Sequence, residues 1–260
     1  NSNMLENPLY KKNQETLEAH GYHFIAPAYG ELACGWQGQG KLPDPQEILL
    51  AAQALFGKQD LAGKTVLVTA GPTREEIDPV RFLSNYSSGK MGYAIAAAAS
   101  HRGARVVLVS GPVNLPEPHG VETIQVASAM EMHQAVMAEA EHADIIIKAA
   151  AVADFRPTAR GEQKVKKGSS EKMMIELQRN PDILAELGKK KGSRILIGFA
   201  AETEELLKNA REKLTKKNLD LIVANDVTME GAGFDGDTNI VRFLSADGSV
   251  EELPEMSKAL

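Results

Sequence analysis

The stretch TVLVTAGPTREEIDPVRFLSNYSSGKMG, from Thr65 to Gly92, decides the fold of this chain. Its first six residues, Thr65 to Ala70, are mostly apolar and β-branched, which favours a short buried strand of a parallel sheet. The turn from Gly71 to Thr73 ends that strand sharply, and residues Ser88 to Gly92 lead into an alanine-rich segment that favours a helix. Because backbone N–H groups at such turns and at a helix N-terminus can hold an anion, the stretch predicts a nucleotide site, to which Lys90 adds a positive charge.

The common nucleotide-binding signatures do not fit this stretch. A Walker A loop requires a glycine where Ser84 stands and a serine or threonine where Met91 stands. No G-x-G-x-x-G sequence follows the strand, so the standard NAD fingerprint is absent as well. The alternative interpretation is a tight connection between strand and helix in which the glycines serve only close packing.

Length and composition indicate a cytoplasmic α/β protein. The chain has 260 residues, of which 43% are hydrophobic and 5% aromatic, enough to bury at least one full core. A net charge of -6 argues against a nucleic-acid surface, although it leaves room for a local phosphate site. The single cysteine, Cys34, rules out an intrachain disulfide, and no apolar run has the length that a membrane span needs. Because the chain opens on a polar segment at Asn1, we expect it to be a piece of a longer protein.

The order of apolar runs and helical patterns predicts the architecture. Residues 1–60 are rich in Asn, Pro and Gly and indicate an appendage with helices near 8–21 and 45–56. From residue 64 onward, strands alternate with helices, which predicts a parallel sheet covered on both faces. The expected strands are 65–70, 105–110, 123–126, 144–149, 194–199 and 219–224, and the expected helices are 92–102, 129–140, 181–190 and 202–217. The fold class is therefore α/β, a Rossmann-like, doubly wound, mostly parallel sheet with an N-terminal appendage and a C-terminal antiparallel hairpin of residues 239–244 and 250–253.

Small and polar residues follow the expected strands. Gly71 and Gly111 each follow a strand, and so do the segments 149–154, 198–202 and 225–226. In a doubly wound sheet, ligands bind beyond the carboxyl ends of the strands. We therefore expect these segments to gather around one crevice.

Some polar residues near that crevice have two interpretations. Asp154, in KAAAVADFR, is placed for a hydroxyl, a metal or a cation, but it can equally cap a helix. The basic run of residues 163–167 can hold phosphates or can be solvated surface. Lys213 and Lys217, four apart on one helical face, can reach one polyphosphate or can face solvent.

Arg81 and Asn85 supply a guanidinium and a carboxamide in the long polar loop. These groups suit a carboxylate or phosphate and a developing oxyanion, respectively. The six histidines show no metal-binding spacing, and Met173 and Met174 are expected in the core or in a sheet.

Seven segments, taken in order, resemble one known family. They are AGPTREEIDPVRFLSNYSSGKMG, AAAVADF, KVKK, RNPDIL, GFAAET, KLTKKNLDLIVAND and GFDGDTN, and they extend over about residues 61–260. This region is similar to the phosphopantothenoylcysteine synthetase domain of the bacterial bifunctional coenzyme A biosynthesis proteins. Seven ordered matches are far more specific than any single loop.

Residues 1–60 resemble the other half of the same family. NSNMLENP is similar to the end of the Pro-x-Met-Asn motif of the flavin-dependent decarboxylase, although Leu5 stands where the family more often has Trp. GELACGWQGQGKL is similar to the substrate-covering segment of that half, and its reactive cysteine corresponds to Cys34. The resemblance implies that residues 1–60 are a remnant of an FMN-dependent half, covalently linked in the full protein, and that this chain lacks decarboxylase activity because the FMN-binding portion would precede Asn1.

The resemblance implies a CTP-dependent ligase. The family joins 4'-phosphopantothenate to L-cysteine in two steps through an acyl-cytidylate, with Mg2+ or Mn2+ and with release of pyrophosphate and CMP. The family forms homodimers, so the loop of residues 78–85 is expected to serve a neighbouring subunit's site. The Gly- and Lys-containing loop of residues 161–170 is expected to be a mobile lid that closes on CTP.

The resemblance also assigns residues to roles. Asn85 and Arg81 are matched to the handling of the acyl-cytidylate, and Lys164 to contact with the nucleotide. The metal ligands stay unassigned. The other positions matched to nucleotide binding are Gly71, Pro72, Thr73, Ser88, Gly89, Lys90, Gly92, Lys148, Ala149, Ala150, Asp154, Arg179, Asn180, Pro181, Asp182, Phe199, Lys213 and Lys217.

Two other functions compete with the ligase. An NAD(P)-dependent oxidoreductase would use the same sheet, but the missing fingerprint and the lack of a Tyr-x-x-x-Lys pair count against it. A non-catalytic dimerising module that supports a flavoprotein decarboxylase is the second alternative. Only the ligase should release pyrophosphate from CTP in the presence of 4'-phosphopantothenate.

Overall fold

The computed structural model describes residues 2–32, 35–166, 173–202, 206–226, 236 and 238–258. The chain divides into two compact units, Asn1–Lys58 and Gln59–Leu260. No helix in the described part of the chain has the length and apolar character to cross a membrane.

The first unit is small and has little buried surface. It contains the helices α1 (Ser2–Leu5), α2 (Pro8–Ala19) and α3 (Pro45–Phe56) and an antiparallel pair of strands, β1 (Ala28–Glu31) and β2 (Gln37–Lys41). Pro8 follows the N-cap Asn7, whose side chain accepts a hydrogen bond from the Leu9 N–H, so the sequence itself starts α2. None of the residues of α2 is buried. The helices expected near 8–21 and 45–56 are therefore present.

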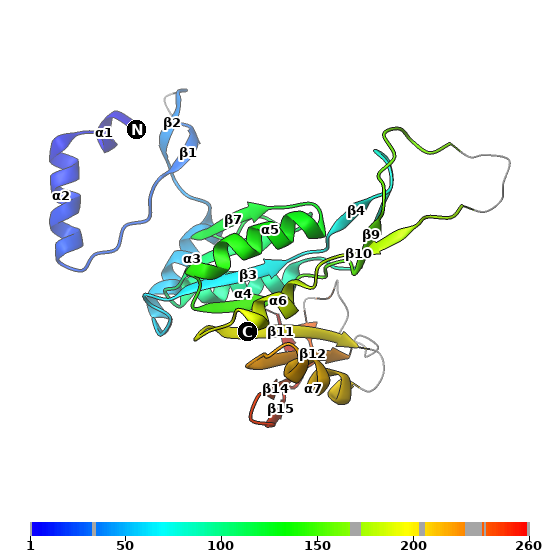
Figure 1. Ribbon diagram of the computed structural model, residues 1–260. Helices are drawn as coiled ribbons and strands as arrows, with labels where there is room; N and C mark the ends of the chain where they lie inside the picture. Colours follow the sequence, from blue (N-terminus) through cyan, green and yellow to red (C-terminus); the bar gives the residue numbers. More distant parts are fainter. Residues whose placement is uncertain are drawn as a thin grey trace. The chain divides into compact units, whose positions relative to one another are not determined.

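The second unit is built on an eight-stranded sheet (Figure 1). Its strand order is β15-β14-β12-β11-β8-β3-β6-β7, and all neighbours from β12 to β7 are parallel. Counted along the chain, the six parallel strands lie in the order 3-2-1-4-5-6 of a Rossmann fold. The strands are β3 (Thr65–Ala70), β6 (Arg105–Ser110), β7 (Val121–Gln125), β8 (Ile145–Lys148), β11 (Ile195–Glu202), β12 (Leu221–Asp226), β14 (Val241–Ser245) and β15 (Val250–Glu252).

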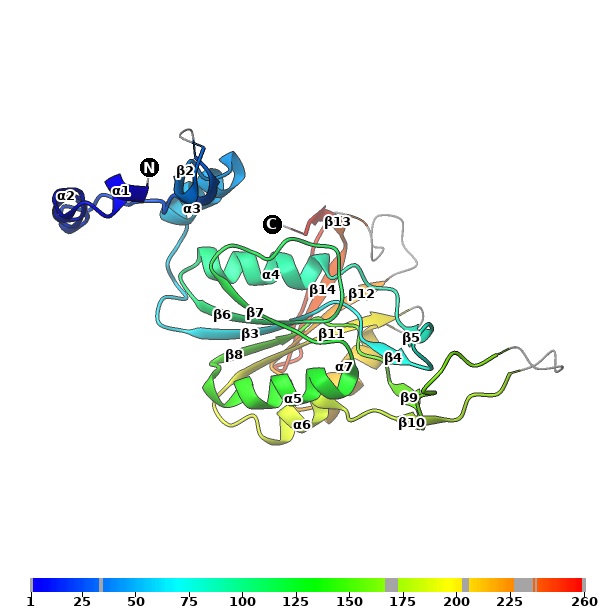
Figure 2. The same cartoon turned by 90° about the horizontal axis from the view of Figure 1, so that it is seen from above.

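Helices cover both faces of this sheet (Figure 2). On one face, α4 (Lys90–His101) packs small side chains such as Ala96 against Val66 and Val68 of β3. The opposite face carries α5 (Ala129–Glu139), α6 (Ile183–Lys189) and α7 (Leu206–Lys216), and a short 3-10 helix, η1 (Ala140–His142), follows α5. The strands β3 and β6 are thus buried on both sides, which explains their near-continuous runs of Val and Leu.

Short strand pairs extend beyond the carboxyl edge of the sheet (Figure 1). β4 (Arg74–Glu76) pairs with β5 (Phe82–Ser84), and β9 (Phe155–Pro157) pairs with β10 (Leu177–Arg179). A further pair, β13 (Thr238–Asn239) with β16 (Met256–Ser257), lies near the C-terminus. The sequence did not predict any of these pairs.

The predicted fold class is confirmed, including the C-terminal hairpin formed by β14 and β15. Most of the expected boundaries differ from the observed ones by one to three residues, as at β7, β11 and β12. α4 begins at Lys90 instead of Gly92, because Gly89 adopts the left-handed conformation and caps the helix, and α6 begins at Ile183, because Asp182 is its N-cap. The described part of α7 begins at Leu206, and residues 203–205, in the helix expected from 202, lie outside the described residues.

Two predictions about side chains were wrong. Met173 is 50% exposed and Met174 is 97% exposed, so neither lies in the core. Both residues precede the short strand β10, which lies outside the main sheet and offers no buried face for them. Asp154 does not cap a helix, because the strand β9 follows it directly.

Candidate functional site

The two halves of the doubly wound sheet meet between β3 and β8, where ligands of this fold bind. The loops that leave these strands are joined to each other by an isolated parallel bridge between Pro72 and Ala151. The Ala151 N–H donates to the Gly71 carbonyl at 2.9 Å, and the Thr73 N–H donates to the Ala151 carbonyl at 3.3 Å. The chain therefore holds the two loops in fixed register at the centre of the crevice.

Two buried threonines support this junction. The Thr69 hydroxyl accepts a hydrogen bond from the Ala150 N–H at 3.1 Å, and the Thr73 hydroxyl accepts one from the Ala153 N–H at 3.0 Å. Both side chains are completely buried. Thr73 was expected to bind the nucleotide through its backbone, whereas nothing in the sequence pattern indicated Thr69.

A pocket of about 370 Å³ opens on one side of the junction, beyond the ends of β8 and β11. We call it the β8–β11 pocket. Ten of the predicted nucleotide residues line it: Lys148, Ala150, Asp154, Arg179, Asn180, Pro181, Asp182, Phe199, Lys213 and Lys217. The expected convergence of strand ends is thereby confirmed for this side of the crevice.

The charge of this pocket is positive. Its lining includes four basic side chains, Lys148, Arg179, Lys213 and Lys217, and two carboxylates, Asp154 and Asp182. An excess of cations in a concave site favours an anionic ligand.

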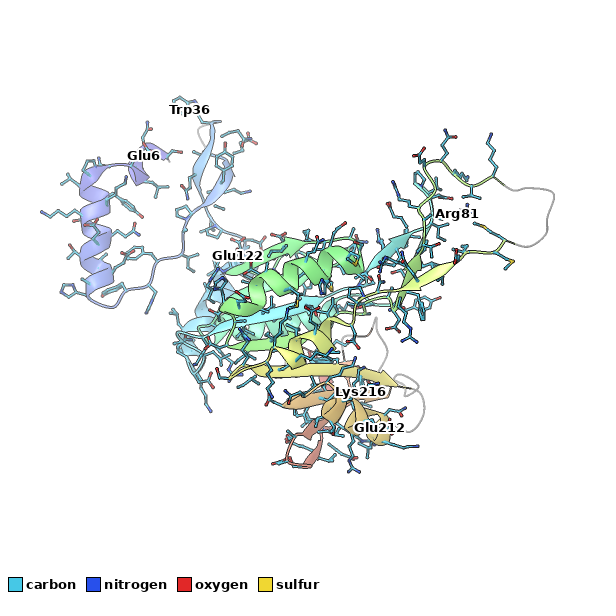
Figure 3. The ribbon with its side chains drawn as sticks, viewed as in Figure 1. Glu6, Trp36, Arg81, Glu122, Glu212 and Lys216 are labelled. Atoms are coloured by element: carbon cyan, nitrogen blue, oxygen red, sulfur yellow. The ribbon has the colours of Figure 1, made fainter. Side chains whose placement is uncertain are left out.

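Lys213 and Lys217 reach the pocket from α7 because they lie four residues apart on one helical face. The Lys213 Nζ donates to the Phe199 carbonyl at 3.3 Å, and the Lys217 Nζ lies 2.9 Å from an Asp182 carboxylate oxygen. By contrast, Glu212 and Lys216 of the same helix are exposed (Figure 3). The solvated-surface interpretation is therefore wrong for Lys213 and Lys217.

Asp182 connects this charge cluster to α6. Its carboxylate accepts a hydrogen bond from the Ala185 N–H at 3.0 Å, as an N-cap does. Although burial raises the pKa of this carboxyl, the hydrogen bond from Ala185 and the interactions with Lys217 lower it below its usual value overall. Asp182 therefore stays ionised and already offsets one of the lysines.

Lys148 has the most unusual environment of the cluster. It is the last residue of β8 and is 8% exposed. Burial lowers the pKa of its ammonium group to about 7; Asp182 opposes this effect, whereas Lys217 and Lys213 add to it. Lys148 was matched to nucleotide binding by resemblance alone, and nothing in the sequence pattern indicated a buried amine.

Phe199 and Asn180 line the pocket in ways that the sequence did not specify. Because side chains alternate along a strand, the Phe199 ring lies on the same face of β11 as Ile197, the face that α4 covers. There it lines an apolar cavity of about 380 Å³. The Phe199 carbonyl, in contrast, accepts a hydrogen bond from Lys213. The Asn180 side chain donates to the Ala153 carbonyl at 2.8 Å and so shapes the loop after β8.

A second pocket, of about 510 Å³, lies by the loop after β3 and the start of α4. We call it the β3 loop pocket. Gly89 has a φ of 79°, which favours glycine, and no side chain caps α4 at this residue. The predicted residues that line this pocket are Pro72, Asn85, Ser88 and Lys90.

Gly92 has a packing role. A Cβ on Gly92 would lie 2.5 Å from the Ala70 Cβ and 2.9 Å from the Thr69 carbonyl oxygen. The close contact between α4 and β3 therefore requires glycine here, in agreement with the packing alternative.

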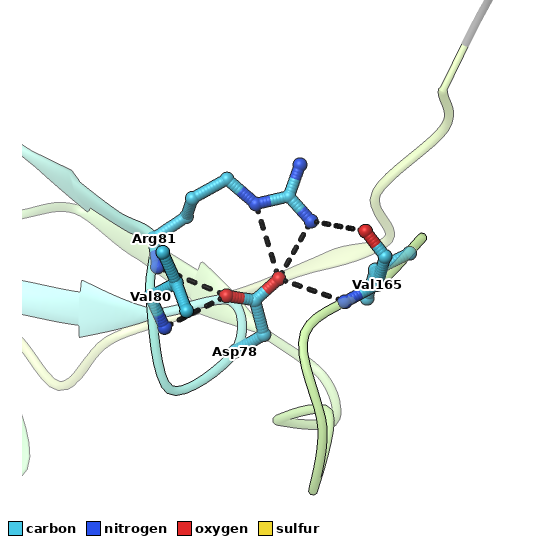
Figure 4. Close-up of polar contacts among 4 residues, drawn as sticks. All are labelled: Asp78, Val80, Arg81 and Val165. Atoms are coloured by element: carbon cyan, nitrogen blue, oxygen red, sulfur yellow. Dashed lines mark hydrogen bonds and ion pairs between the residues drawn. The ribbon is translucent and has the colours of Figure 1, made fainter. Parts of the chain in front are cut away.

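Asn85 and Arg81 lie on the loop around β5 and have different partners. The Asn85 Nδ2 donates to the carbonyls of Val152 at 3.1 Å and Ala151 at 3.3 Å, so this side chain reaches the junction between the two pockets. The Arg81 Nη2 lies 2.6 Å from Asp78 and donates to the Val165 carbonyl at 3.0 Å (Figure 4). The guanidinium of Arg81 thus binds two groups of the protein itself, the Asp78 carboxylate and the Val165 carbonyl.

Asp78 is the centre of this set of contacts, which we call the Asp78–Arg81 anchor. Its fully buried carboxylate accepts hydrogen bonds from the Arg81 guanidinium and from the backbone N–H groups of Val80, Arg81 and Val165 (Figure 4). The Arg81 side chain holds the pKa of this carboxyl well below its usual range. Because both the N–H and the carbonyl of Val165 are bound, the anchor holds the backbone next to Lys164.

The loop expected to be a lid is therefore attached at its start. The Gly161 N–H donates to the Ile77 carbonyl at 2.9 Å, and Arg160 forms an ion pair with Glu76. Residues 167–172 lie outside the described residues, so the mobile lid stays a prediction. Cys34 also lies outside them.

The structure does not bring every predicted residue to a pocket lining. The loops of the junction contain four of the others, Gly71, Thr73, Gly89 and Ala149. Lys164 is exposed and lies next to Val165, which the Asp78–Arg81 anchor binds. In the part of the chain that the structure describes, no group of three or more His, Cys, Asp or Glu is arranged to hold a metal ion.

The fold and site define a Rossmann-like α/β domain with a cationic pocket at its topological switch point. A family model described as the DNA/pantothenate metabolism flavoprotein C-terminal domain matches residues 61–260, and the chain belongs to this family.

Similar proteins agree with this assignment. The coenzyme A biosynthesis bifunctional protein CoaBC of Bacillus subtilis (strain 168) is 52% identical over 99% of this chain and 64% of its own length. CoaBC of Vibrio parahaemolyticus is 47% identical, over 100% of this chain and 66% of its own length. A crystal structure of the C-terminal domain of CoaBC aligns with a TM-score of 0.65 and 48% identity, over 76% of this chain and 90% of its own. The chain thus spans about two thirds of these curated relatives.

Proposed function

We propose that this chain is a phosphopantothenate–cysteine ligase of coenzyme A biosynthesis, which joins 4'-phosphopantothenate to L-cysteine with CTP. The β8–β11 pocket carries the proposal, because it gathers ten of the predicted nucleotide residues around a cationic centre. The 52% identity to a coenzyme A biosynthesis protein supports the same conclusion. The family match leaves the oxidoreductase alternative without support.

In the first step, the carboxylate of 4'-phosphopantothenate attacks the α-phosphorus of CTP. A P–O bond forms, the bond to pyrophosphate breaks, and negative charge moves onto the leaving group. Lys213 and Lys217 would stabilise this charge electrostatically, as fixed cations do in phosphoryl transfer. Lys164, held in place by the Asp78–Arg81 anchor, would contribute a further charge.

In the second step, the amine of cysteine attacks the acyl carbonyl of the cytidylate. The C–N bond forms, the bond to CMP breaks, and the nitrogen loses a proton. Asn85 is placed to donate a hydrogen bond near the reacting acyl group, because its Nδ2 reaches the junction between the two pockets. The β3 loop pocket beside it would hold 4'-phosphopantothenate.

We propose Mg2+ or Mn2+ as the accompanying cation. Mg2+ typically binds substrate phosphates and water with only one or two carboxylates. The described residues contain no three-ligand cluster, which fits a cation held mainly by the nucleotide. We assign no protein ligand to it.

We further propose that the chain acts as a homodimer and belongs to a longer protein. Val80, Phe82 and Tyr86, on and beside the β4–β5 hairpin, are 58%, 47% and 90% exposed, and such exposed apolar side chains favour a subunit contact. Residues 1–60 would be the end of an FMN-dependent decarboxylase half, in which Cys34 would be the reactive residue. The exposed side chains Leu9 and Leu17 of α2 suit a helix that packs against that half.

Pyrophosphate release tests the proposal. The chain is incubated with CTP, Mg2+ and 4'-phosphopantothenate, first without and then with L-cysteine, and the products are identified by mass spectrometry. We expect an acyl-cytidylate that becomes phosphopantothenoylcysteine, with reduced rates in Asn85→Ala, Lys164→Ala and Lys213→Ala. Lys216→Ala, on the exposed side of α7, is the matched control. A folded chain that releases no pyrophosphate would favour the non-catalytic module.

A further inference from the structure

Lys148 is held in the β8–β11 pocket by the central strand of the site. β8 is hydrogen-bonded to β3 and β11, and Lys148 stands opposite Thr69 and Gly198 in the register. Because side chains alternate, Lys148 lies on the same face as Ile146, which packs beneath α5 and α6. The side chain of Lys148 therefore lines the pocket at the end of β8. Because β8 is paired on both sides, the backbone of Lys148 has little freedom to move.

Charged groups face Lys148 from each element around the pocket. Asp182 lies at the start of α6, Lys213 belongs to α7, Lys217 directly follows α7, Arg179 ends β10, and Asp154 follows β8. In the described part of the chain, Asp182 is the one carboxylate whose charge raises the pKa of Lys148. However, Asp182 already bonds to Lys217 and to the Ala185 N–H.

The protein groups around Lys148 therefore disfavour a proton on its amine. Burial lowers the pKa of the amine to about 7, from an ordinary value of 10.5, and Lys217 and Lys213 act in the same direction. Near neutral pH, protonated and neutral forms coexist. A polyanion that enters the pocket reverses the balance, because it places negative charge beside the amine in a site of low dielectric.

We propose that the side chain of Lys148 is an additional ligand for the phosphates of the nucleotide and that it takes up one proton from solvent when the nucleotide binds. This inference rests on the proposed function, since it takes the nucleotide as the occupant of the β8–β11 pocket. Lys148 is then a nucleotide-binding residue that becomes charged when the nucleotide binds.

The sign of the pH dependence follows from the linkage between protons and ligand. Below the pKa that Lys148 has without nucleotide, the amine is protonated in both states, so it adds no pH dependence to binding. Above that value, binding requires proton uptake, and the affinity falls by up to about tenfold for each pH unit until the pKa of the complex is reached. Without Lys148 this part of the dependence vanishes.

Titration calorimetry with CTP and Mg2+, in two buffers of different ionisation enthalpy, measures the proton uptake directly. At about pH 8 we expect the unmodified chain to take up between about 0.5 and 1 proton for each nucleotide. We expect Lys148→Met to lose this uptake and Lys148→Arg, which stays charged, to bind without it. Lys189→Met, on the exposed side of α6, should behave as the unmodified chain does, and circular dichroism confirms that each variant is folded.

The outcomes separate the two proposals. Equal proton uptake in the unmodified chain and in Lys148→Met, with CTP bound by both, overturns the inference and leaves the proposed function intact. Binding of inorganic tripolyphosphate with uptake that depends on Lys148, without binding of CTP, overturns CTP as the substrate and retains the inference. Failure to bind either probe overturns both.

Discussion

Replacing Lys148 by methionine should stabilise the protein near neutral pH. Met has a similar length and carries no charge, so the substitution removes the buried amine and preserves the packing. The fall of the pKa from 10.5 to about 7 means that the folded state binds the proton far less readily than the unfolded chain. That difference corresponds to about 4 kcal/mol of lost stability near pH 7.

The pH profile identifies the cause. Between pH 7 and the usual lysine pKa, the unfolded chain carries more protons at this position, so Lys148 lowers stability less as the pH rises. The difference between Lys148→Met and the unmodified chain should therefore be largest at or below about pH 7 and should shrink by about 2 kcal/mol by about pH 9. A change that affected packing alone would not vary with pH.

Urea unfolding followed by circular dichroism measures this difference. Tryptophan fluorescence is unsuitable, because the single tryptophan, Trp36, lies outside the unit that contains the sheet. Lys189→Met serves as the control for loss of an exposed lysine. A stability difference for Lys148→Met that is constant from about pH 7 to about pH 9 would refute the reasoning, because it would mean that the buried amine does not titrate in this range.

Three further substitutions test the packing and contacts around the site. Gly111→Ala should destabilise the protein by about 2–4 kcal/mol in urea unfolding, because its Cβ would lie 1.8 Å from the Pro72 carbonyl oxygen; an unchanged midpoint would contradict this contact. Gly188→Ala adds about 1 kcal/mol of helix propensity, but its Cβ would lie 2.0 Å from the Lys217 carbonyl oxygen. We therefore expect a net loss of about 1–3 kcal/mol in the free energy of unfolding. A gain in stability would mean that Gly188 and Lys217 are farther apart. Asp78→Asn should raise the KM for CTP even under conditions in which the variant, despite lower thermal stability, is still folded. An unchanged KM would show that the Asp78–Arg81 anchor does not position the nucleotide site.

The sequence predicted the sheet well because its strands carry a strong local signal. β3 and β6 are buried on both faces, so their runs of Val and Leu stand out, and both lie where the pattern placed them. The β4–β5 pair was missed because each strand has only three residues and several are charged. The β9–β10 pair joins segments about twenty residues apart, which no local pattern indicates.

The site was predictable where it follows from topology. Residues at the ends of β8 and β11 had to converge, because parallel strands end at the same edge. The partner of Arg81 was not predictable, since Asp78 and Val165 meet it only through the fold. The buried state of Lys148 was not predictable either, because it depends on how α6 and α7 cover the end of β8.

A crystal structure of the chain with CTP and 4'-phosphopantothenate tests the central claim most directly. The account predicts the nucleotide in the β8–β11 pocket, with its phosphates beside Lys148, Lys213 and Lys217 and with 4'-phosphopantothenate in the β3 loop pocket near Asn85. Nucleotide density elsewhere on the chain, with the β8–β11 pocket empty, would contradict the account.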